Sequence, residues 1–170
     1  MYRIAITGTE STGKTTLVKQ LAQHYNTVFV PDISRAHIER LKGKYKRENV
    51  FDIAADIIKT EDEMLAKANG VLFSDNCLVN IKIWLKYYEW EVPEWLNDAV
   101  EKRKSDLYLV CDIDIPWVRD EQRKNPHDRA ELLFMFTDNL HDMVANYKFV
   151  SGTGNERLLS AIKQVDRLLA

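Results

Sequence analysis

Residues 2–25 of the chain read YRIAITGTESTGKTTLVKQLAQHY. The apolar run at residues 2–7 predicts a β-strand, and the apolar spacing at residues 15–25 predicts a helix. The segment between them, from Gly8 to Thr15, matches the pattern G-x-x-x-x-G-K-[ST]. Because this pattern stands after a strand and before a helix, where its mechanism needs it, the stretch predicts a phosphate-binding loop in an α/β fold.

The residue types of this loop suit a nucleoside triphosphate. Its glycines let backbone N–H groups point inward at a phosphate, and the following helix adds the positive end of its dipole. Lys14 is expected to bridge the β- and γ-phosphates, and Thr15 to bind Mg²⁺. Glu10 either faces Mg²⁺-bound water or substrate, or is a solvated side chain. The predicted site for ATP and Mg²⁺ comprises Gly8, Thr9, Glu10, Ser11, Thr12, Gly13, Lys14, Thr15 and Thr16. The alternative is a glycine-rich turn without a ligand.

The rest of the chain alternates strand-like apolar runs with longer helical patterns. Further strands are predicted at residues 27–30, 71–74, 107–111 and 149–150. Further helices are predicted at residues 33–41, 51–68, 78–88, 94–104, 129–146 and 156–169. Strands that alternate with helices in this way predict a parallel sheet covered on both faces, within a single domain over residues 1–170.

Composition excludes several classes of protein. With 24 basic and 26 acidic residues the formal charge is −2, so no global field would hold a nucleic acid. No apolar run approaches the roughly 18 residues that span a bilayer, so no membrane partner is expected. Cys77 and Cys111 lack metal-binding spacing, which predicts two free, buried thiols in a cytoplasmic protein. The sequence leaves open whether the chain forms a homo-oligomer.

The residues at the end of the third predicted strand help to distinguish a kinase from other nucleotide-binding proteins. It ends in an acid, Asp75, which is expected to bind Mg²⁺ as a Walker-B aspartate. The next residue is Asn76, whereas many ATP-hydrolysing machines place a glutamate there to activate water. A guanine-reading Asn-Lys-x-Asp motif is also missing from the sequence. These features favour a small-molecule kinase over an ATPase or a GTPase switch.

The second predicted strand is followed by an acid and an arginine. Asp32 lies at the carboxyl edge of the predicted sheet, and Arg35 would share its face of the next helix. A carboxylate at this edge can take the proton of an acceptor hydroxyl, while Arg35 can orient substrate or hold phosphate oxygens. Asp32 stands equally well as the N-cap of that helix. Both roles stay open.

Residues 116–129 read PWVRDEQRKNPHDR and are dense in arginine. Such a segment can fold over a triphosphate as a lid, supply positive charge to the transition state and exclude water. Arg123 and Arg129 are the preferred catalytic contacts. The alternative is a solvated, charge-balanced loop, and we favour the lid because a phosphate-binding loop precedes it.

Three further patterns concern the purine, the acceptor ring and the protein surface. Gly152 and Thr153 follow the fifth strand, where backbone groups can frame a purine, although a helix-opening turn explains the glycines as well. Trp84 and Tyr88 could stack on a flat acceptor ring, although aromatic residues at helical spacing are mostly core. Residues 42–47 are interpreted as a solvated basic loop.

Together these residues resemble the ribosylnicotinamide kinase domain of the bifunctional bacterial NAD-biosynthesis regulator and its stand-alone relatives. The matching pieces are the loop at residues 8–17, Asp32 with Arg35, the run FSD at 73–75, and P-W-x-x-D-x-x-R at 116–123. The resemblance implies a three-layer P-loop NTPase fold like that of nucleoside and nucleotide kinases, with a lid and strand order 2-3-1-4-5. It also implies transfer from ATP to the 5′-hydroxyl of nicotinamide riboside, a nucleoside-like acceptor.

The sequence departs from that family at two positions. The family usually carries an acid two residues after the Walker-B aspartate and another directly after the arginine, where this chain has Cys77 and Ala36. A kinase for another nucleoside or nucleotide, and an ATP-binding regulatory module with little turnover, therefore stay as alternatives. No adenylyltransferase domain is expected in the chain, so it would carry out one step.

Overall fold

A parallel sheet forms the centre of the computed structural model. Within the described residues, 1–42, 44, 46–118 and 127–170, the sheet has five strands. They are β1 (Tyr2–Thr7), β2 (Phe29–Val30), β3 (Val71–Asp75), β4 (Leu107–Cys111) and β5 (Tyr147–Val150). Their order is β2-β3-β1-β4-β5 with parallel pairing throughout, which confirms the predicted fold and strand order.

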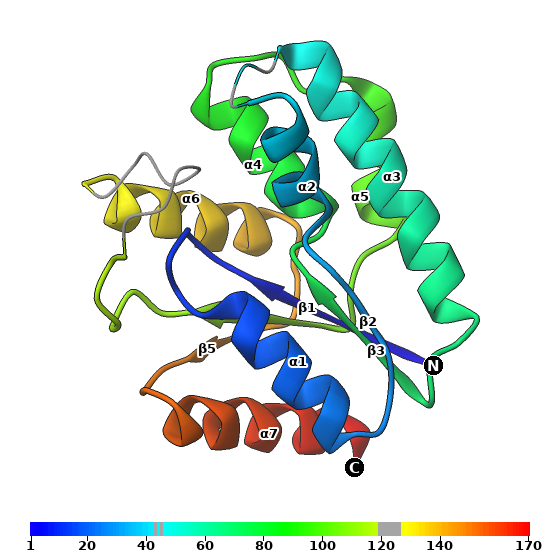
Figure 1. Ribbon diagram of the computed structural model, residues 1–170, viewed down its shortest axis with the longest axis vertical. Coiled ribbons are helices and arrows are strands. Elements are labelled where there is room, and N and C mark those ends of the chain that lie inside the picture. The colour runs from blue at the N-terminus through cyan, green and yellow to red at the C-terminus, as the bar shows by residue number, and fades with distance from the viewer. Residues whose placement is uncertain (43, 45, 119–126) are drawn as a thin grey trace.

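Helices cover both faces of this sheet (Figure 1). One face is covered by α1 (Lys14–His24) and α7 (Asn155–Leu169), which contact each other. The other face packs against α3 (Arg47–Leu65), α4 (Leu78–Tyr87), α5 (Glu94–Lys102) and α6 (Arg129–Asp142), while α2 (Ile33–Arg40) contacts α3. No helix in the described part of the chain is long and apolar enough to cross a membrane.

Alternating side chains of the strands divide the core in two. Ile4 and Ile6 of β1 belong to the cluster beneath α1 and α7, whereas Ala5 belongs to the cluster beneath α3 to α6. Every residue of β3 and of β4 is buried. Successive side chains of a strand point to opposite faces, so strands covered on both sides are largely apolar, and in β3 only Ser74 and Asp75, at its carboxyl end, are polar.

Strand register brings the carboxyl ends of the strands to one edge. Ile6 pairs with Asp75 and Thr7 with Val110, while Val30 pairs with Ser74. The segments that follow these strands therefore leave the sheet side by side. Open α/β sheets bind their ligands at this edge, so the fold places the predicted site residues in one region.

Helix α3 begins at Arg47, earlier than the predicted start at residue 51. The Asn49 side chain accepts a hydrogen bond from the Lys46 backbone N–H at 2.9 Å, which stabilises the first turn. The Arg47 guanidinium lies over the Phe51 ring and donates to the Glu91 carbonyl oxygen at 2.9 Å. Arg47 is therefore part of a helix, and the interpretation of residues 42–47 as wholly a solvated basic loop was wrong at this residue.

Candidate active site

The loop from Gly8 to Lys14 is shaped by the sheet beneath it. Gly8 has φ 121°, and a Cβ there would lie 2.9 Å from the Cys111 carbonyl oxygen, so a side chain is sterically excluded. The buried Thr12 hydroxyl donates to the Thr9 carbonyl oxygen at 2.9 Å. These two contacts stabilise the conformation of the loop.

Lys14 is the first residue of α1 and lies at the mouth of the loop. Its Nζ donates to the Thr9 carbonyl oxygen at 2.6 Å. Gly13 is the N-cap of α1, and no described side chain caps this helix start or places an acid in its first turn. The positive end of the helix dipole, the first N–H groups and one ammonium therefore converge, as an anion site requires.

Asp75 and Thr15 form the polar pair beside the loop. The Thr15 hydroxyl donates to Asp75 Oδ2 at 2.5 Å, and Asp75 is only 2% exposed. Burial raises the pKa of Asp75 above its ordinary value; the Thr15 hydrogen bond opposes this rise and the charge of Asp32 adds to it. Asp75 Oδ1 has no hydrogen-bond partner among the described residues. A buried carboxylate oxygen beside a hydroxyl fits Mg²⁺, which binds oxygen ligands and completes its shell with phosphates and waters.

Asp32 follows β2 and caps α2. One of its carboxylate oxygens accepts the Arg35 backbone N–H at 3.4 Å, which is the N-cap geometry predicted as one of its two roles. The charge of Asp32 contributes to the raised pKa of Asp75, so the two carboxylates lie close enough to interact electrostatically. The cap is therefore observed, whereas the role as a base stays a prediction.

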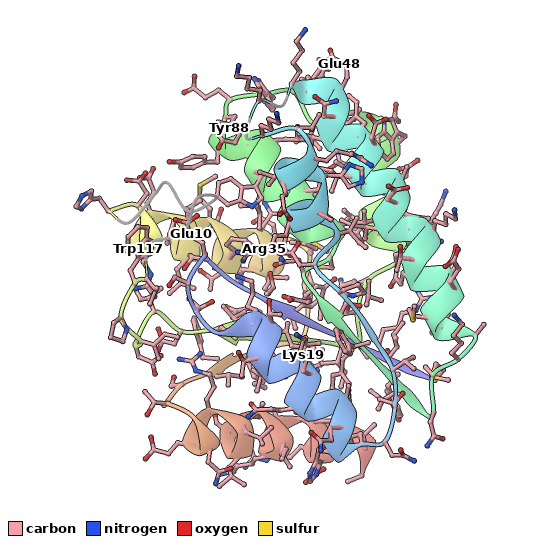
Figure 2. The ribbon with its side chains drawn as sticks, in the orientation of Figure 1. Glu10, Lys19, Arg35, Glu48, Tyr88 and Trp117 are labelled. Carbon is pink, nitrogen blue, oxygen red and sulfur yellow. The ribbon has the colours of Figure 1, made fainter. Side chains whose placement is uncertain are left out.

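The first residues of the predicted lid contact the outer rim of the loop. Trp117 Nε1 donates to Glu10 Oε1 at 3.3 Å, and the Val118 backbone N–H donates to Ser11 Oγ at 2.9 Å. Figure 2 shows Glu10 and Trp117 together at the tip of the loop. Glu10 therefore contacts an indole N–H, an interaction that neither expectation for this residue included.

Arg129 donates hydrogen bonds to two backbone carbonyl oxygens. Its Nη1 donates to the Ile115 carbonyl oxygen at 3.0 Å and its Nη2 to that of Ser11 at 3.4 Å. In this arrangement Arg129 supports the loop, and its predicted contact with a triphosphate stays a prediction. Arg123, the other predicted catalytic arginine, lies outside the described residues.

The aromatic side chains of α4 form their own cluster. Trp84 stacks on Tyr88 with ring centroids 5.9 Å apart, and Tyr88 is 37% exposed. Tyr87 donates to Asp128 Oδ2 at 2.7 Å, and this hydrogen bond raises the pKa of Tyr87 to about 12. Trp84 and Tyr88 are thus incompletely buried members of this aromatic cluster, and their predicted stacking on an acceptor ring stays a prediction.

Asn80 is a site residue that the sequence analysis missed. It is 4% exposed, and its Oδ1 accepts hydrogen bonds from the Thr7 hydroxyl at 3.0 Å and the Cys77 N–H at 3.2 Å. Its Nδ2 donates to Asn76 Oδ1 at 2.7 Å. Asn80 therefore ties the end of β1 to the turn after Asp75. A lone amide within the apolar run of α4 was the signal that could have found it.

Cys77 occupies the position of one missing family acid. It is the half-buried N-cap of α4, and its Sγ contacts Asn80 Oδ1 at 3.5 Å. Burial raises the pKa of Cys77 to about 12. The thiol is therefore neutral at physiological pH and does not replace a carboxylate. The other missing acid is at Ala36, which is exposed on α2.

The residues predicted to frame a purine lie in the loop between β5 and α7. The Gly152 N–H donates to Asp114 Oδ2 at 2.6 Å, and the Gly152 carbonyl oxygen accepts from Arg157 Nε at 2.9 Å. The Thr153 N–H lies 3.5 Å from Glu156 Oε2. The backbone N–H and the carbonyl group of Gly152 are thus both hydrogen-bonded within the protein. Arg157 was also missed, although it shares a buried stripe with Ala161 and Val165, spaced four residues apart.

Comparison with known proteins finds relatives for most of the chain. Residues 3–157 match the family model of an AAA domain. The trifunctional NAD biosynthesis/regulator protein NadR of Escherichia coli K12 is 29% identical over 153 residues, covering 86% of this chain and 37% of that protein. Its counterpart from Salmonella typhimurium LT2 is 30% identical over 124 residues, covering 71% and 30%. The chain thus spans about a third of the length of these curated relatives.

Solved structures share the fold. A NadR protein in complex with NR superposes with a TM-score of 0.77 at 19% identity, over 98% of this chain and 51% of that one. A NadR complex with NAD and AMP-PNP gives 0.78 at 20%, over 98% and 49%. Deoxyadenosine kinase from M. mycoides gives 0.70 at 11%, over 97% and 99%. The architecture is therefore that of P-loop nucleoside kinases.

Proposed function

The chain belongs to the AAA-domain family whose model it matches over residues 3–157, and from that premise we propose that it is an ATP-dependent small-molecule kinase. The proposed reaction moves the γ-phosphoryl group of ATP to the 5′-hydroxyl of nicotinamide riboside. The products are ADP and nicotinamide mononucleotide.

One observation carries the proposal. The Thr15 hydroxyl and the buried Asp75 carboxylate lie together at 2.5 Å beside the loop that holds Lys14, and Asp75 keeps one oxygen without a partner among the described residues. Thr15 and Asp75 would hold Mg²⁺, which neutralises charge on the β- and γ-phosphates when bound. Lys14 would exchange the Thr9 carbonyl oxygen for phosphate oxygens, since a charged acceptor is the stronger partner.

The acceptor side supplies the remaining chemistry. The acceptor oxygen bonds to the γ-phosphorus while the bond to the bridging oxygen breaks and ADP leaves. Asp32 takes the hydroxyl proton, and Arg35 orients the acceptor or holds phosphate oxygens. Both residues lie on the β2 side of the loop, because Asp32 ends the connection that follows β2. Arg123 would add positive charge to the transition state.

Nicotinamide riboside is proposed on the strength of relatives and motifs. The curated relatives are named for NAD biosynthesis, and one NadR structure contains NR. Trp84 and Tyr88 offer a ring surface for the flat nicotinamide. Cys77 and Ala36, in place of acids, favour as second candidates a kinase for another nucleoside or nucleotide, or an ATP-binding module with little turnover.

An acceptor panel tests the proposal. The purified chain is mixed with ATP and Mg²⁺ and with nicotinamide riboside, other nucleosides or nucleoside monophosphates, and ADP release is followed. We expect nicotinamide riboside to stimulate ADP release most, with the mononucleotide detected by mass spectrometry. Stimulation by a different acceptor would reassign the substrate. ATP binding without stimulation by any acceptor would favour the regulatory module.

A further inference from the structure

A buried ion pair holds the loop between β5 and α7. Arg157 of α7 is 5% exposed, and its guanidinium forms an ion pair with Asp114. The same guanidinium donates from Nε to the Gly152 carbonyl oxygen at 2.9 Å and from Nη1 to the Val150 carbonyl oxygen at 3.1 Å. One side chain thus connects the last residue of β5, the loop and the segment after β4.

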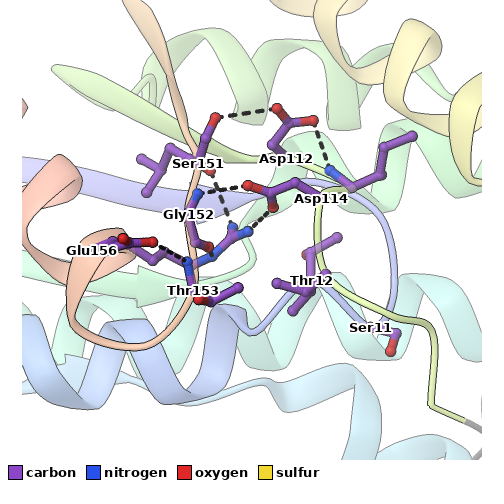
Figure 3. A network of polar contacts seen from close by, with 12 residues as sticks. Ser11, Thr12, Asp112, Asp114, Ser151, Gly152, Thr153 and Glu156 are labelled. Carbon is purple, nitrogen blue, oxygen red and sulfur yellow. Dashed lines mark hydrogen bonds and ion pairs between the residues drawn. The ribbon is translucent and has the colours of Figure 1, made fainter.

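Asp114 completes this arrangement from the opposite side. Its second carboxylate oxygen accepts the Gly152 N–H at 2.6 Å, so the ion pair holds both polar backbone groups of that glycine. Figure 3 shows Asp112 and Asp114 facing Ser151 and Gly152. Gly152 has φ 94°, and a Cβ there would lie 2.9 Å from Glu156 Cβ. The loop is therefore tightly folded onto α7.

A second contact ties the same two segments together. The Ser151 hydroxyl donates to Asp112 Oδ2 at 3.1 Å, while Asp112 Oδ1 accepts the Ile113 N–H at 2.7 Å. The segments that follow β4 and β5 are consequently joined by two hydrogen bonds from neutral donors to carboxylates, Ser151 to Asp112 and Gly152 to Asp114, and the ion pair with Arg157 of α7 adds a third contact.

The segment after β4 also reaches the phosphate-binding loop. Ile115 directly follows Asp114, and its Cδ1 lies 3.6 Å from the position that a Cβ of Gly13 would occupy. The Ile115 carbonyl oxygen accepts from Arg129, which also donates to the Ser11 carbonyl oxygen. Residue 115, directly after Asp114, thus contacts the loop at Gly13, where Arg129 holds both segments independently of Asp114.

Strand order decides which end of a nucleotide meets the loop at residues 151–154. The phosphate-binding loop follows β1 at the centre of the sheet, and Asp32 follows β2 at one edge. A triphosphate on the central loop, with its γ end toward Asp32, directs its nucleoside end toward β4 and β5. On the proposed function, the loop after β5 would then border the base.

We propose that Arg157 is a positioning residue for the nucleoside end of ATP, which rests on the proposed function. Arg157 and Asp114 hold residues 151–154 against the segment 112–115, so the base meets a preformed surface and little loop ordering accompanies binding. Because the N–H and carbonyl of Gly152 are both engaged, this glycine contributes shape to the surface. The ion pair should therefore govern affinity for the base-bearing end and leave the phosphate end unchanged.

A comparison of two ligands tests this role. Arg157→Met removes the guanidinium and keeps much of the apolar stem, and calorimetry then gives the Kd for ATP and for inorganic triphosphate, which has no base. We expect ATP to bind about tenfold more weakly and inorganic triphosphate within about twofold of the unsubstituted chain. In turnover, KM for ATP should rise by the same factor while kcat and KM for the acceptor stay unchanged.

Three further variants separate positioning from loss of structure. Arg157→Lys keeps an ion pair with Asp114 but loses the two-carbonyl fork, so an intermediate loss is expected. Asp114→Asn keeps an acceptor for the Gly152 N–H without the charge and replaces Arg157→Met if that chain does not fold. Arg167→Met changes an exposed arginine in the last turn of the same helix and should leave both Kd values unchanged.

The outcomes are distinguishable. An equal loss of affinity for ATP and inorganic triphosphate would mean that Arg157 only supports the fold, which overturns the inference. Unchanged ATP affinity in Arg157→Met overturns it as well. If the unsubstituted chain binds neither ligand, the proposed function fails first.

Discussion

In the phosphate-binding loop, backbone groups and short buried side chains determine the geometry, whereas the residues proposed to contact the acceptor are exposed side chains from separate parts of the chain. Thr9 and Thr12 are at most 1% exposed and lie within one contiguous motif. Arg35 and Tyr88 are exposed; Arg35 comes from α2, and Tyr88 directly follows α4 as its C-cap. Phosphate chemistry is common to many kinases and is encoded locally, while acceptor identity depends on residues that the fold brings together.

Removal of the Lys14 side chain should have the largest effect on the phosphate-binding part of the site. Lys14→Ala should lower kcat by about a thousandfold, because it removes a preorganised charge on the transferred group. Its melting temperature should hardly change, since Nζ contacts a single carbonyl oxygen. Lys59→Ala, an exposed lysine of α3, is the matched control in the coupled ADP assay. Near-normal turnover in Lys14→Ala would contradict the assignment of the loop.

Asp32→Asn tests the acceptor side and separates the two roles of this residue. Asparagine is as good an N-cap as aspartate, so α2 should remain stable, but the amide cannot take a proton. We expect kcat to fall about a hundredfold with little change in KM for ATP. Turnover equal to that of the unsubstituted chain, with Asp32→Ala less stable to heat, would leave Asp32 as a cap alone.

Cys77→Asp sharpens the comparison by restoring an acid on the acceptor side. The carboxylate can still cap α4, and a charged hydrogen bond to a ribose hydroxyl should raise kcat/KM for nicotinamide riboside about tenfold. Cys77→Ser is the matched control, because it caps the helix without adding charge. Equal kcat/KM values for the two variants would show that position 77 does not face the acceptor.

Asp75→Asn should show the smallest effect, measured as the free energy of unfolding against pH. Burial raises the pKa of Asp75, so the ionised carboxylate destabilises the folded state once the pH exceeds its unfolded pKa. The variant should therefore melt a few degrees higher at about pH 8, and this gain should shrink as the pH falls toward the unfolded pKa of an aspartate, about 3.9, and vanish below it. A gain independent of pH would contradict the electrostatic cause, whereas loss of turnover is expected throughout.

The fold was predictable from the sequence because its signals are local. The predicted bounds of β1 and β4 agree with the structure, since each strand is a short apolar run. The start of α3 was not predictable in this way, because Arg47 depends on Glu91, 44 residues away in the sequence. The apolar spacing predicted the apolar part of α3 but did not predict that its polar first turn is helical.

The site was predictable in part for the same reason. The loop, Asp75 and Asp32 stand next to strand ends, so each could be placed from its neighbours in the sequence. Asn80 pairs with Thr7 across 73 residues, and Arg157 with Asp114 across 43. Pairing over such separations depends on strand order, so these two residues emerged only with the fold.

The close approach of Gly8 to Cys111 has a consequence for dynamics. Since the first residue of the loop packs directly against the last residue of β4, the start of the loop is held in place as long as the central strands stay paired. Amide hydrogens in the loop and in those strands should then exchange with solvent as one cooperative unit. A nucleotide that slows hydrogen exchange in the loop should therefore slow it equally in the central strands.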